Sequence, residues 1–194
     1  MSDGKLERAF ERIDAANAED PREEEVDGEA VPKEWIYGRR MSATLDAFRP
    51  DAPEPVKLAA RAQHIQRWKI PRDEYPMDRK GYLRWRQTLY GMHADLAAAI
   101  CEEVGYDAET IAKVRKLLRK KGLKSDPDVQ LLEDVICLVF LEHYFAAFAA
   151  EHEEEKVISI LQKTWRKMSE AGQRAALALE LGPERALVEK ALAG

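Results

Sequence analysis

The chain of 194 residues has only two cysteines, Cys101 and Cys137, and no apolar run of the roughly 18–20 residues that a membrane crossing requires. Two cysteines within apolar helical patterns cannot form the disulfide framework of a small secreted domain, so we expect both to be buried. The initial stretch, MSDGKLERAF, lacks the basic end and the apolar core of a signal peptide. These absences predict a cytoplasmic protein that has no membrane partner.

An excess of basic residues is also lacking. The formal net charge is −5, from 31 Lys and Arg against 36 Asp and Glu, so we do not expect nucleic acid to be a partner. With 45% hydrophobic and 35% charged residues, the chain has the composition of a globular protein that can bury a sizeable core. We predict an N-terminal helix and acidic linker over residues 1–31 and a single helical domain over residues 32–194.

No segment shows the alternation typical of a strand, and nearly every segment has helical spacing. Residues 18–31, AEDPREEEVDGEAV, carry seven acids against one arginine and predict a solvated linker or loop. The pattern as a whole predicts an all-α bundle of roughly seven to nine helices. The longer predicted helices cover residues 4–17, 32–49, 56–70, 81–105, 107–122, 126–152 and 153–168. We expect Gly105 to end the helix before it and Asp107 to cap the N-terminus of the next one.

Two histidines lie on the inward sides of separate predicted helices. His64 borders the apolar stripe of LAARAQHIQRW, and His93 has apolar neighbours at three- and four-residue spacing in LYGMHADLAAAI. Such a histidine is commonly a hydrogen-bonded core residue. Two of them together with a buried carboxylate would suit a divalent zinc, manganese or iron ion.

The carboxylate would come from Glu133 or Asp134, which interrupt the apolar helix LLEDVICLVFLEHYF. At least one of the two must be buried, and a buried charge needs a partner because leaving it alone costs several kcal/mol or more. The partner could be a metal ion or a basic side chain. In the metal hypothesis, His64, His93 and Asp134 are the ligands, and Glu133 and Asp134 are the candidate catalytic residues.

Basic side chains cluster with aromatic ones in PKEWIYGRRMS, DRKGYLRWR and QKTWRKMS. The planar guanidinium group binds phosphate or carboxylate with two hydrogen bonds, which favours an anionic small molecule as partner. The alternative is that these residues form solvated helix faces whose aliphatic stems cover tryptophan rings. The candidate substrate-binding arginines are Arg39, Arg40, Arg67, Arg79, Arg84 and Arg86.

The order of these features over residues 56–170 resembles the HD-domain superfamily of helical, metal-dependent phosphohydrolases. His64 in AQHIQRW resembles the first histidine of that family, His93 the second, and Asp134 the distal aspartate. The aspartate that should follow the second histidine is replaced by Ala94, and Asp95 is turned by about 100° around the helix. The resemblance implies a divalent metal bound by His64, His93 and Asp134, or alternatively a degenerate, metal-free pocket.

The whole chain also resembles a bacterial domain-of-unknown-function family of small all-helical proteins, through stretches such as PKEWIYGRRMS, HIQRWKIPR and LEDVICLVFLEHYF. This second resemblance supplies no activity, whereas the HD-domain resemblance implies a metal-dependent phosphohydrolase for a phosphorylated small molecule or nucleotide. The alternative function is a non-catalytic helical module that senses a nucleotide or docks on a protein. The sequence leaves open whether the chain forms a homodimer.

Overall fold

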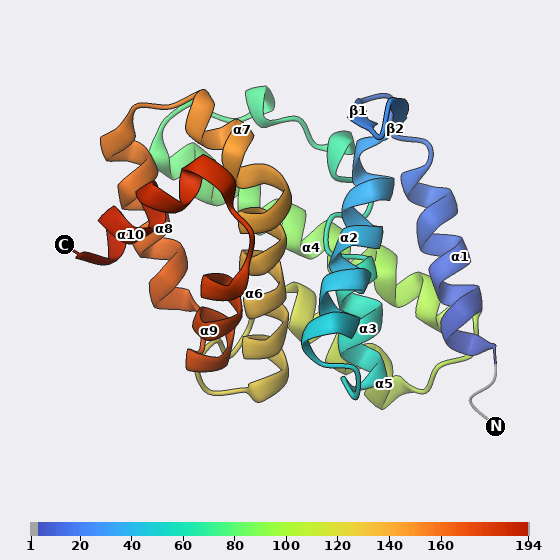
Figure 1. Cartoon of the computed structure of the whole chain (residues 1–194). Helices are drawn as coiled ribbons and strands as arrows, with labels where there is room; N and C mark the ends of the chain where they lie inside the picture. The colour runs from blue at the N-terminus through green and yellow to red at the C-terminus, as the bar shows by residue number, and fades with distance from the viewer. Residues whose placement is uncertain (1–3, 194) are drawn as a thin grey trace. The chain divides into compact units, whose positions relative to one another are not determined.

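The computed structural model describes residues 4–193, which fall into two compact units, residues 4–122 and 123–193 (Figure 1). Both units consist mainly of α-helices, and the one sheet among the described residues is a two-stranded hairpin. The prediction of an all-α fold is confirmed. The ten α-helices within residues 4–193 are one more than the upper end of the predicted range.

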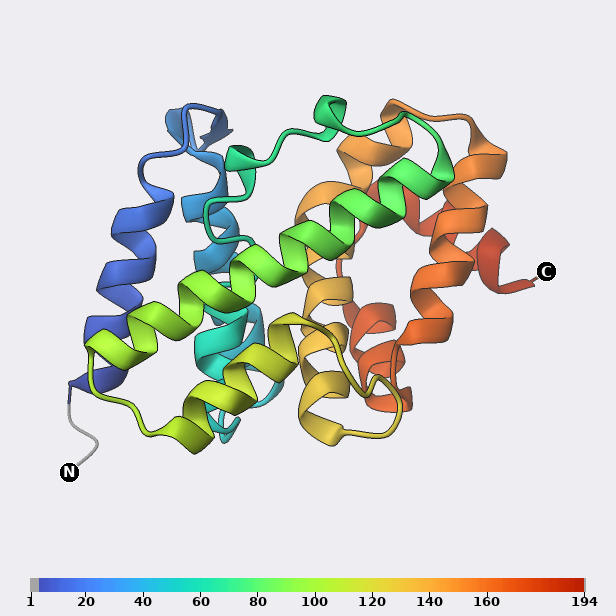
Figure 2. The same cartoon turned by 180° about the vertical axis from the view of Figure 1, so that it is seen from behind.

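The first unit contains the hairpin and five α-helices. Its elements are α1 (Lys5–Asn17), β1 (Glu23–Val26), β2 (Glu29–Pro32), α2 (Lys33–Phe48), α3 (Glu54–Arg61), the short 3-10 helices η1 (Arg67–Lys69) and η2 (Arg72–Glu74), α4 (Arg79–Glu103) and α5 (Ala108–Leu118). The long helix α4 runs beside α5, as Figure 2 shows, and α3 packs on α2 and α5. Fully buried apolar side chains such as Ile13, Met41 and Leu58 form the core of this unit.

The second unit contains the remaining helices. Its elements are α6 (Pro127–Val139), the π-helical turn η3 (Phe140–Tyr144), α7 (Phe145–Ala150), α8 (Glu154–Lys167), α9 (Glu170–Ala178), the 3-10 helix η4 (Gly182–Glu184) and α10 (Arg185–Ala193). The predicted continuous helix over residues 126–152 is wrong, because the π-helical turn interrupts it after Val139. None of the helices in residues 4–193 has the length and apolarity that a membrane crossing needs.

The capping signals around α4 and α5 predicted the ends of these helices well. α4 ends where Gly105 takes a positive φ of 87°, as a glycine after a helix C-terminus commonly does. The Asp107 carboxylate then accepts a hydrogen bond of 2.7 Å from the backbone N–H of Thr110 and caps α5. Both predicted signals are confirmed. The burial of Cys101 and Cys137 is confirmed as well.

The prediction of a linker or loop over residues 18–31 is wrong, because β1 and β2 pair there as an antiparallel hairpin from Glu23 opposite Pro32 to Val26 opposite Glu29. The connection is Asp27-Gly28, with φ values of 52° and 84°. A two-residue turn with positive φ at both positions matches the twist of paired strands, and Asp-Gly is a typical sequence for it. That dipeptide was the local signal for strands within the acidic segment.

The predicted helix over residues 56–70 is also wrong in its second half, because α3 ends at Arg61. Gln66 has a left-handed φ of 51°, and its backbone N–H donates to the Asn17 side chain over 2.9 Å. The carbonyls of Ile65 and Ile70 accept hydrogen bonds of 2.8 and 2.9 Å from His93 and Trp85 of α4. Contacts with two other helices therefore hold residues 62–70 as an irregular turn. This turn carries His64.

Candidate functional site

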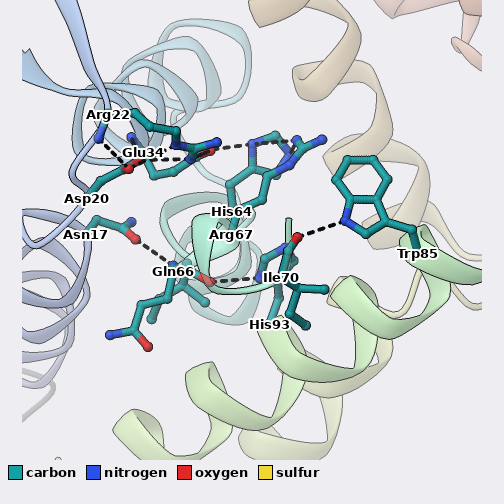
Figure 3. Close-up of polar contacts among 11 residues, drawn as sticks. Asn17, Asp20, Arg22, Glu34, His64, Gln66, Arg67, Ile70, Trp85 and His93 are labelled. Atoms are coloured by element: carbon teal, nitrogen blue, oxygen red, sulfur yellow. Dashed lines mark hydrogen bonds and ion pairs between the residues drawn. The ribbon is translucent and has the colours of Figure 1, made fainter. Parts of the chain in front are cut away.

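His64 lies where the irregular turn approaches the start of α2. Its Nδ1 atom is 3.2 Å from the Oε2 atom of Glu34, which lies in the first turn of that helix (Figure 3). The carboxylate of Glu34 is ionised at neutral pH and can only accept a hydrogen bond, so Nδ1 must be the atom that carries the imidazole proton. The lone pair of His64 is therefore on Nε2.

The guanidinium group of Arg67 lies over the face of the His64 ring. Its Nη1 atom is 2.9 Å from Nε2 of His64 and 3.3 Å from Nδ1, whereas an atom in line with the Nε2 lone pair would be much farther from Nδ1 than from Nε2. The Nε2 lone pair lies in the ring plane and is therefore not directed at Arg67. The His64 ring is stacked on the Tyr37 ring, with centroids 4.0 Å apart and planes 11° apart. Arg67 also lies over the Trp85 ring, 5.0 Å from its centroid. These contacts fix the orientation of both His64 and Arg67.

His93 lies next to His64, with the two ring centroids 6.1 Å apart. Its Nδ1 atom donates to the carbonyl of Ile65 over 2.8 Å, so the lone pair of this imidazole is also on Nε2. That Nε2 atom has no hydrogen-bond partner among residues 4–193. Only 2% of His93 is exposed, whereas the His64 side chain is 21% exposed and forms the solvent side of the pair.

The surroundings keep both imidazoles neutral and Glu34 charged. Burial and the charge of Arg67 lower the pKa of His64 to about 4, against the opposing effect of Glu34. Burial and the neighbouring His64 lower the pKa of His93 to about 3. Burial alone would raise the pKa of Glu34, but His64 and the guanidinium groups of Arg67 and Arg22 outweigh it and lower this pKa to about 2. At neutral pH the site has two basic lone pairs and one carboxylate.

A second layer of charged groups holds Glu34 in place. Arg22 donates to the other carboxylate oxygen of Glu34 over 2.8 Å, and to both oxygens of Asp20 over 3.0 Å (Figure 3). Asp20 also accepts a hydrogen bond of 3.2 Å from the backbone N–H of Glu34 at the start of α2. The buried carboxylates are thus paired, and Glu34 keeps one oxygen directed at His64.

The predicted catalytic acids belong to the second unit. Both Glu133 and Asp134 are buried, which confirms the expectation that at least one of them would be. The Oδ1 atom of Asp134 accepts hydrogen bonds from the Ser169 backbone N–H and the Gln130 amide, over 2.8 and 3.0 Å, and Oδ2 accepts one from the Ser169 hydroxyl over 2.5 Å. Glu133 has the Lys167 ammonium group 3.6 Å away. Through its hydrogen bonds with Ser169, the N-cap residue of α9, Asp134 links α6 to the N-terminus of α9.

Within residues 4–193, no group of three or more histidine, cysteine or acidic side chains is arranged to hold a metal ion. His64 and His93 are brought together as predicted and would supply two nitrogen ligands, one fewer than a catalytic zinc site commonly uses. The third predicted ligand, Asp134, already accepts three hydrogen bonds. The divalent metal (Mn, Fe or Zn) therefore stays a prediction.

Residues 7–188 match the family described as "Domain of unknown function (DUF4202)". The chain belongs to this family. The predicted resemblance to a domain-of-unknown-function family is thereby confirmed, whereas the HD-domain resemblance stays a prediction. No curated protein and no solved structure matches the chain.

The family match assigns no activity. The contacts of the candidate arginines and of Asp95 show which of these side chains lie near His64 and His93. Arg67 is the one candidate arginine that contacts either histidine in the described part of the chain. Asp95, which could have replaced the missing HD-type aspartate, is bound by Arg115 and Arg119 of the α5 region, and Ala94 is fully buried. The other candidate arginines lie as follows: Arg39 pairs with Asp14 at 3.1 Å, Arg40 pairs with Glu24, Arg86 bonds to the Tyr90 hydroxyl, and Arg79 and Arg84 are exposed.

We expect the Asp134→Ala variant to lower the free energy of unfolding by about 2–3 kcal/mol, because it leaves the Ser169 and Gln130 donors without their acceptor. Gly172→Ala should act in the same direction, since its Cβ would lie 2.7 Å from the Asp134 carboxyl carbon. Urea unfolding followed by circular dichroism measures both effects. The exposed neighbour variant Glu170→Ala is the control, and an Asp134→Ala protein as stable as this control would contradict the structural role of Asp134.

Proposed function

We propose that the protein binds a phosphorylated small molecule at His64 and Arg67 and hydrolyses its phosphate ester. The observation that carries the proposal is that an anion-binding guanidinium group lies 2.9 Å from Nε2 of an imidazole whose other nitrogen faces Glu34. A base and a phosphate-binding group thus act at one point. The imidazole is positioned by a carboxylate, as the histidine of a Ser-His-Asp triad is.

The proposed binding of the phosphate depends on positively charged side chains next to the His64 imidazole. Arg67 presents a planar fork for two phosphate oxygens while its other face rests on Trp85. Lys120, two residues after the end of α5, is close enough that its charge lowers the pKa of His64, so it attracts the same anion. Arg67 would turn from His64 to the phosphate, a short movement because the imidazole and guanidinium groups are already in contact.

The same movement activates the base. Arg67 lowers the pKa of His64, and a phosphate dianion that neutralises Arg67 removes this effect and raises that pKa towards the neutral range. The His64 imidazole then takes a proton from the attacking water, and Glu34 stabilises the imidazolium ion that forms. The ester P–O bond breaks, the leaving oxygen takes a proton from solvent water, and the imidazolium ion returns its proton to the hydroxide ion that remains.

The experiment is a release assay for inorganic phosphate over a panel of phosphate esters, beginning with p-nitrophenyl phosphate and including sugar phosphates and nucleotides. We expect His64→Gln to lower kcat/KM by about 10²–10⁴-fold, the usual contribution of a general base. Arg67→Met should act mainly on KM because it removes a phosphate-binding group. His152→Gln and Arg174→Gln, in the second unit, are the matched controls. Unchanged turnover in His64→Gln would exclude the proposed role of this residue.

Metal dependence is tested in the same assay. If the predicted divalent ion is bound, the Nε2 atoms of His64 and His93 are the ligands that the first unit offers, and the ion would polarise a phosphoryl oxygen and lower the pKa of a bound water. Elemental analysis of purified wild type, His64→Gln and His93→Gln should then show the ion only in the wild type. Activity that persists after treatment with a chelator, in a protein without bound metal, would exclude metal dependence.

A second function, a non-catalytic module for an anionic ligand, is favoured by Ala94, which is fully buried and occupies the position at which the HD-domain resemblance implies an aspartate. In this case Arg67 and Lys120 would bind the anion, and no ester would be cleaved. Calorimetric titration with inorganic phosphate and with nucleotides separates the two functions. Binding that is lost in Arg67→Met, without turnover of any ester in the wild type, would support the binding module over the hydrolase.

A further inference from the structure

The structure places a nucleophile, and not only a base, at the point where the phosphate would be held. Stacking on Tyr37 together with the hydrogen bond to Glu34 prevents the His64 ring from turning, so its Nε2 lone pair keeps one direction in the ring plane. Arg67 lies over the face of the ring, with Nη1 only 2.9 Å from Nε2. A phosphate group bound by Arg67 is therefore held within a few ångströms of Nε2.

We propose that His64 accepts the phosphoryl group itself and forms a phosphohistidine at Nε2 during hydrolysis. This inference rests on the proposed binding and hydrolysis of a phosphate ester at this site. It replaces direct attack by water, with His64 as the base, by attack of His64 itself. It adds a modification site, with a phosphate ester or phosphoramidate as the phosphoryl donor.

The first step transfers the phosphoryl group to the ring. The Nε2 lone pair forms a P–N bond as the ester P–O bond breaks, and the leaving oxygen keeps the electron pair of that bond and takes a proton from solvent water. The imidazole becomes positively charged. Glu34 offsets this charge through the Nδ1–H hydrogen bond, and Arg67 binds the phosphoryl oxygens.

The second step returns the histidine to its starting state. A water molecule attacks phosphorus, the P–N bond breaks, and its electron pair returns to Nε2 of His64. The proton of that water passes to Nε2 of His93, which has a lone pair, no partner among residues 4–193, and a ring centroid 6.1 Å from that of His64. His93 then releases the proton to solvent, and inorganic phosphate leaves.

The environment explains why the acceptor is His64 rather than His93. The Nδ1–H group of His64 faces a charged carboxylate, which stabilises a positive ring much better than the neutral Ile65 carbonyl that faces His93. His64 also has the greater exposure and the contact with Arg67, whereas His93 is almost fully buried. The two histidines thus have different roles in one reaction.

The test uses the full chain incubated with phosphoramidate, and with acetyl phosphate in parallel, followed by intact mass spectrometry at alkaline pH. We expect one added PO3 group that is stable to base and removed by acid, on a tryptic peptide with the sequence AQHIQR. His64→Gln should lose the label. His93→Gln should accumulate it, because dephosphorylation without the second imidazole is expected to slow by about 10²-fold.

Two further measurements distinguish His64 acting as a nucleophile from His64 acting as a base. His64→Gly should regain phosphate release when free imidazole is added, because the added ring can occupy the space of the missing side chain, and circular dichroism checks that this variant is folded. Ester hydrolysis without any label, in wild type and in His93→Gln, would overturn the phosphohistidine and leave His64 as a base. Label that persists in His64→Gln would also overturn it. No label together with no hydrolysis of any ester would overturn both proposals.

Discussion

Acid is expected to destabilise the first unit from about pH 6.5 downwards, well above the range in which ordinary carboxylates take up protons. An imidazole in the unfolded chain has a pKa near 6.5, whereas the pKa in the folded protein is about 4 for His64 and about 3 for His93. Between these values the unfolded chain binds protons that the folded chain excludes. The free energy of unfolding therefore falls as pH falls through this window.

The expected slope is about 1.4 kcal/mol per pH unit for each of the two imidazoles. Glu34 acts in a lower window, because its pKa is lowered from 4.5 to about 2 and its contribution is lost only as pH falls between those values. Urea unfolding measured at a series of pH values, with tryptophan fluorescence as the probe, gives the slope directly. Three of the four tryptophans lie in the first unit: Trp35, Trp68 and Trp85.

The histidine variants separate this effect from general acid denaturation. His64→Gln and His93→Gln should each remove about half of the slope between pH 6.5 and pH 4.5. Gln87→Ala, which removes an exposed side chain without a titratable group from the first unit, should leave the slope unchanged. An equal slope in wild type and in both cluster variants would show that the two buried histidines do not take up protons on unfolding.

The helices of the fold could be predicted wherever their signals are local. Asp107 and Gly105 are examples, because a capping carboxylate and a glycine with positive φ act within a few residues of the helix end. The hairpin at Asp27-Gly28 had an equally local signal, but the charge of the surrounding glutamates favoured a loop. Here the turn residues were more informative than the composition.

The position of His64 could not be predicted from local pattern. The segment LAARAQHIQRW keeps helical spacing past Arg61, yet α3 ends there because Asn17, His93 and Trp85 bind backbone groups of the following turn. These partners are distant in sequence, and their hydrogen bonds outweigh the local preference for a helix. The pairing of His64 with His93 was predicted, but through helical faces rather than through an irregular turn.

Glu34 was missed, although a signal for it existed. It lies on the buried stripe of α2 with Tyr37, Met41 and Leu45, at the spacing of one helical face. A carboxylate on such a stripe needs a partner, as Asp134 does in the apolar helix α6. The sequence could not show that the partners of Glu34 are Arg22 and His64, because the irregular turn that brings His64 to α2 was itself not predictable.

A single methyl group at position 81 is expected to damage the fold around the site. The Cβ atom of a Gly81→Ala variant would lie 2.0 Å from the carbonyl oxygen of Pro76, and this is backbone that cannot turn aside as a flexible side chain could. Arg72 holds the same segment by donating to the carbonyls of Tyr75 and Pro76, over 2.9 and 2.8 Å. The loop before α4 must therefore move as a whole.

We expect Gly81→Ala to lower the free energy of unfolding by about 2–3 kcal/mol or more, the upper range for inserting a methyl group into packed structure. Because the displaced loop connects η1 to α4, the hydrogen bond between Trp85 and Ile70 should weaken, and Arg67 should lose its fixed place over Trp85. Urea unfolding measures the loss of stability. Tryptophan fluorescence of the folded variant reports the change around Trp85.

Gly91→Ala is the matched control, since Gly91 lies in the same helix and its Cβ would meet no heavy atom within 4 Å. This variant should raise the free energy of unfolding by up to about 1 kcal/mol, because alanine favours a helix more than glycine does. The two changes add the same methyl group to one helix and should shift stability in opposite directions. A Gly81→Ala protein as stable as the Gly91→Ala protein would show that the loop over residues 71–78 is not packed on the start of α4, and the fixed position of Arg67 would then need another cause.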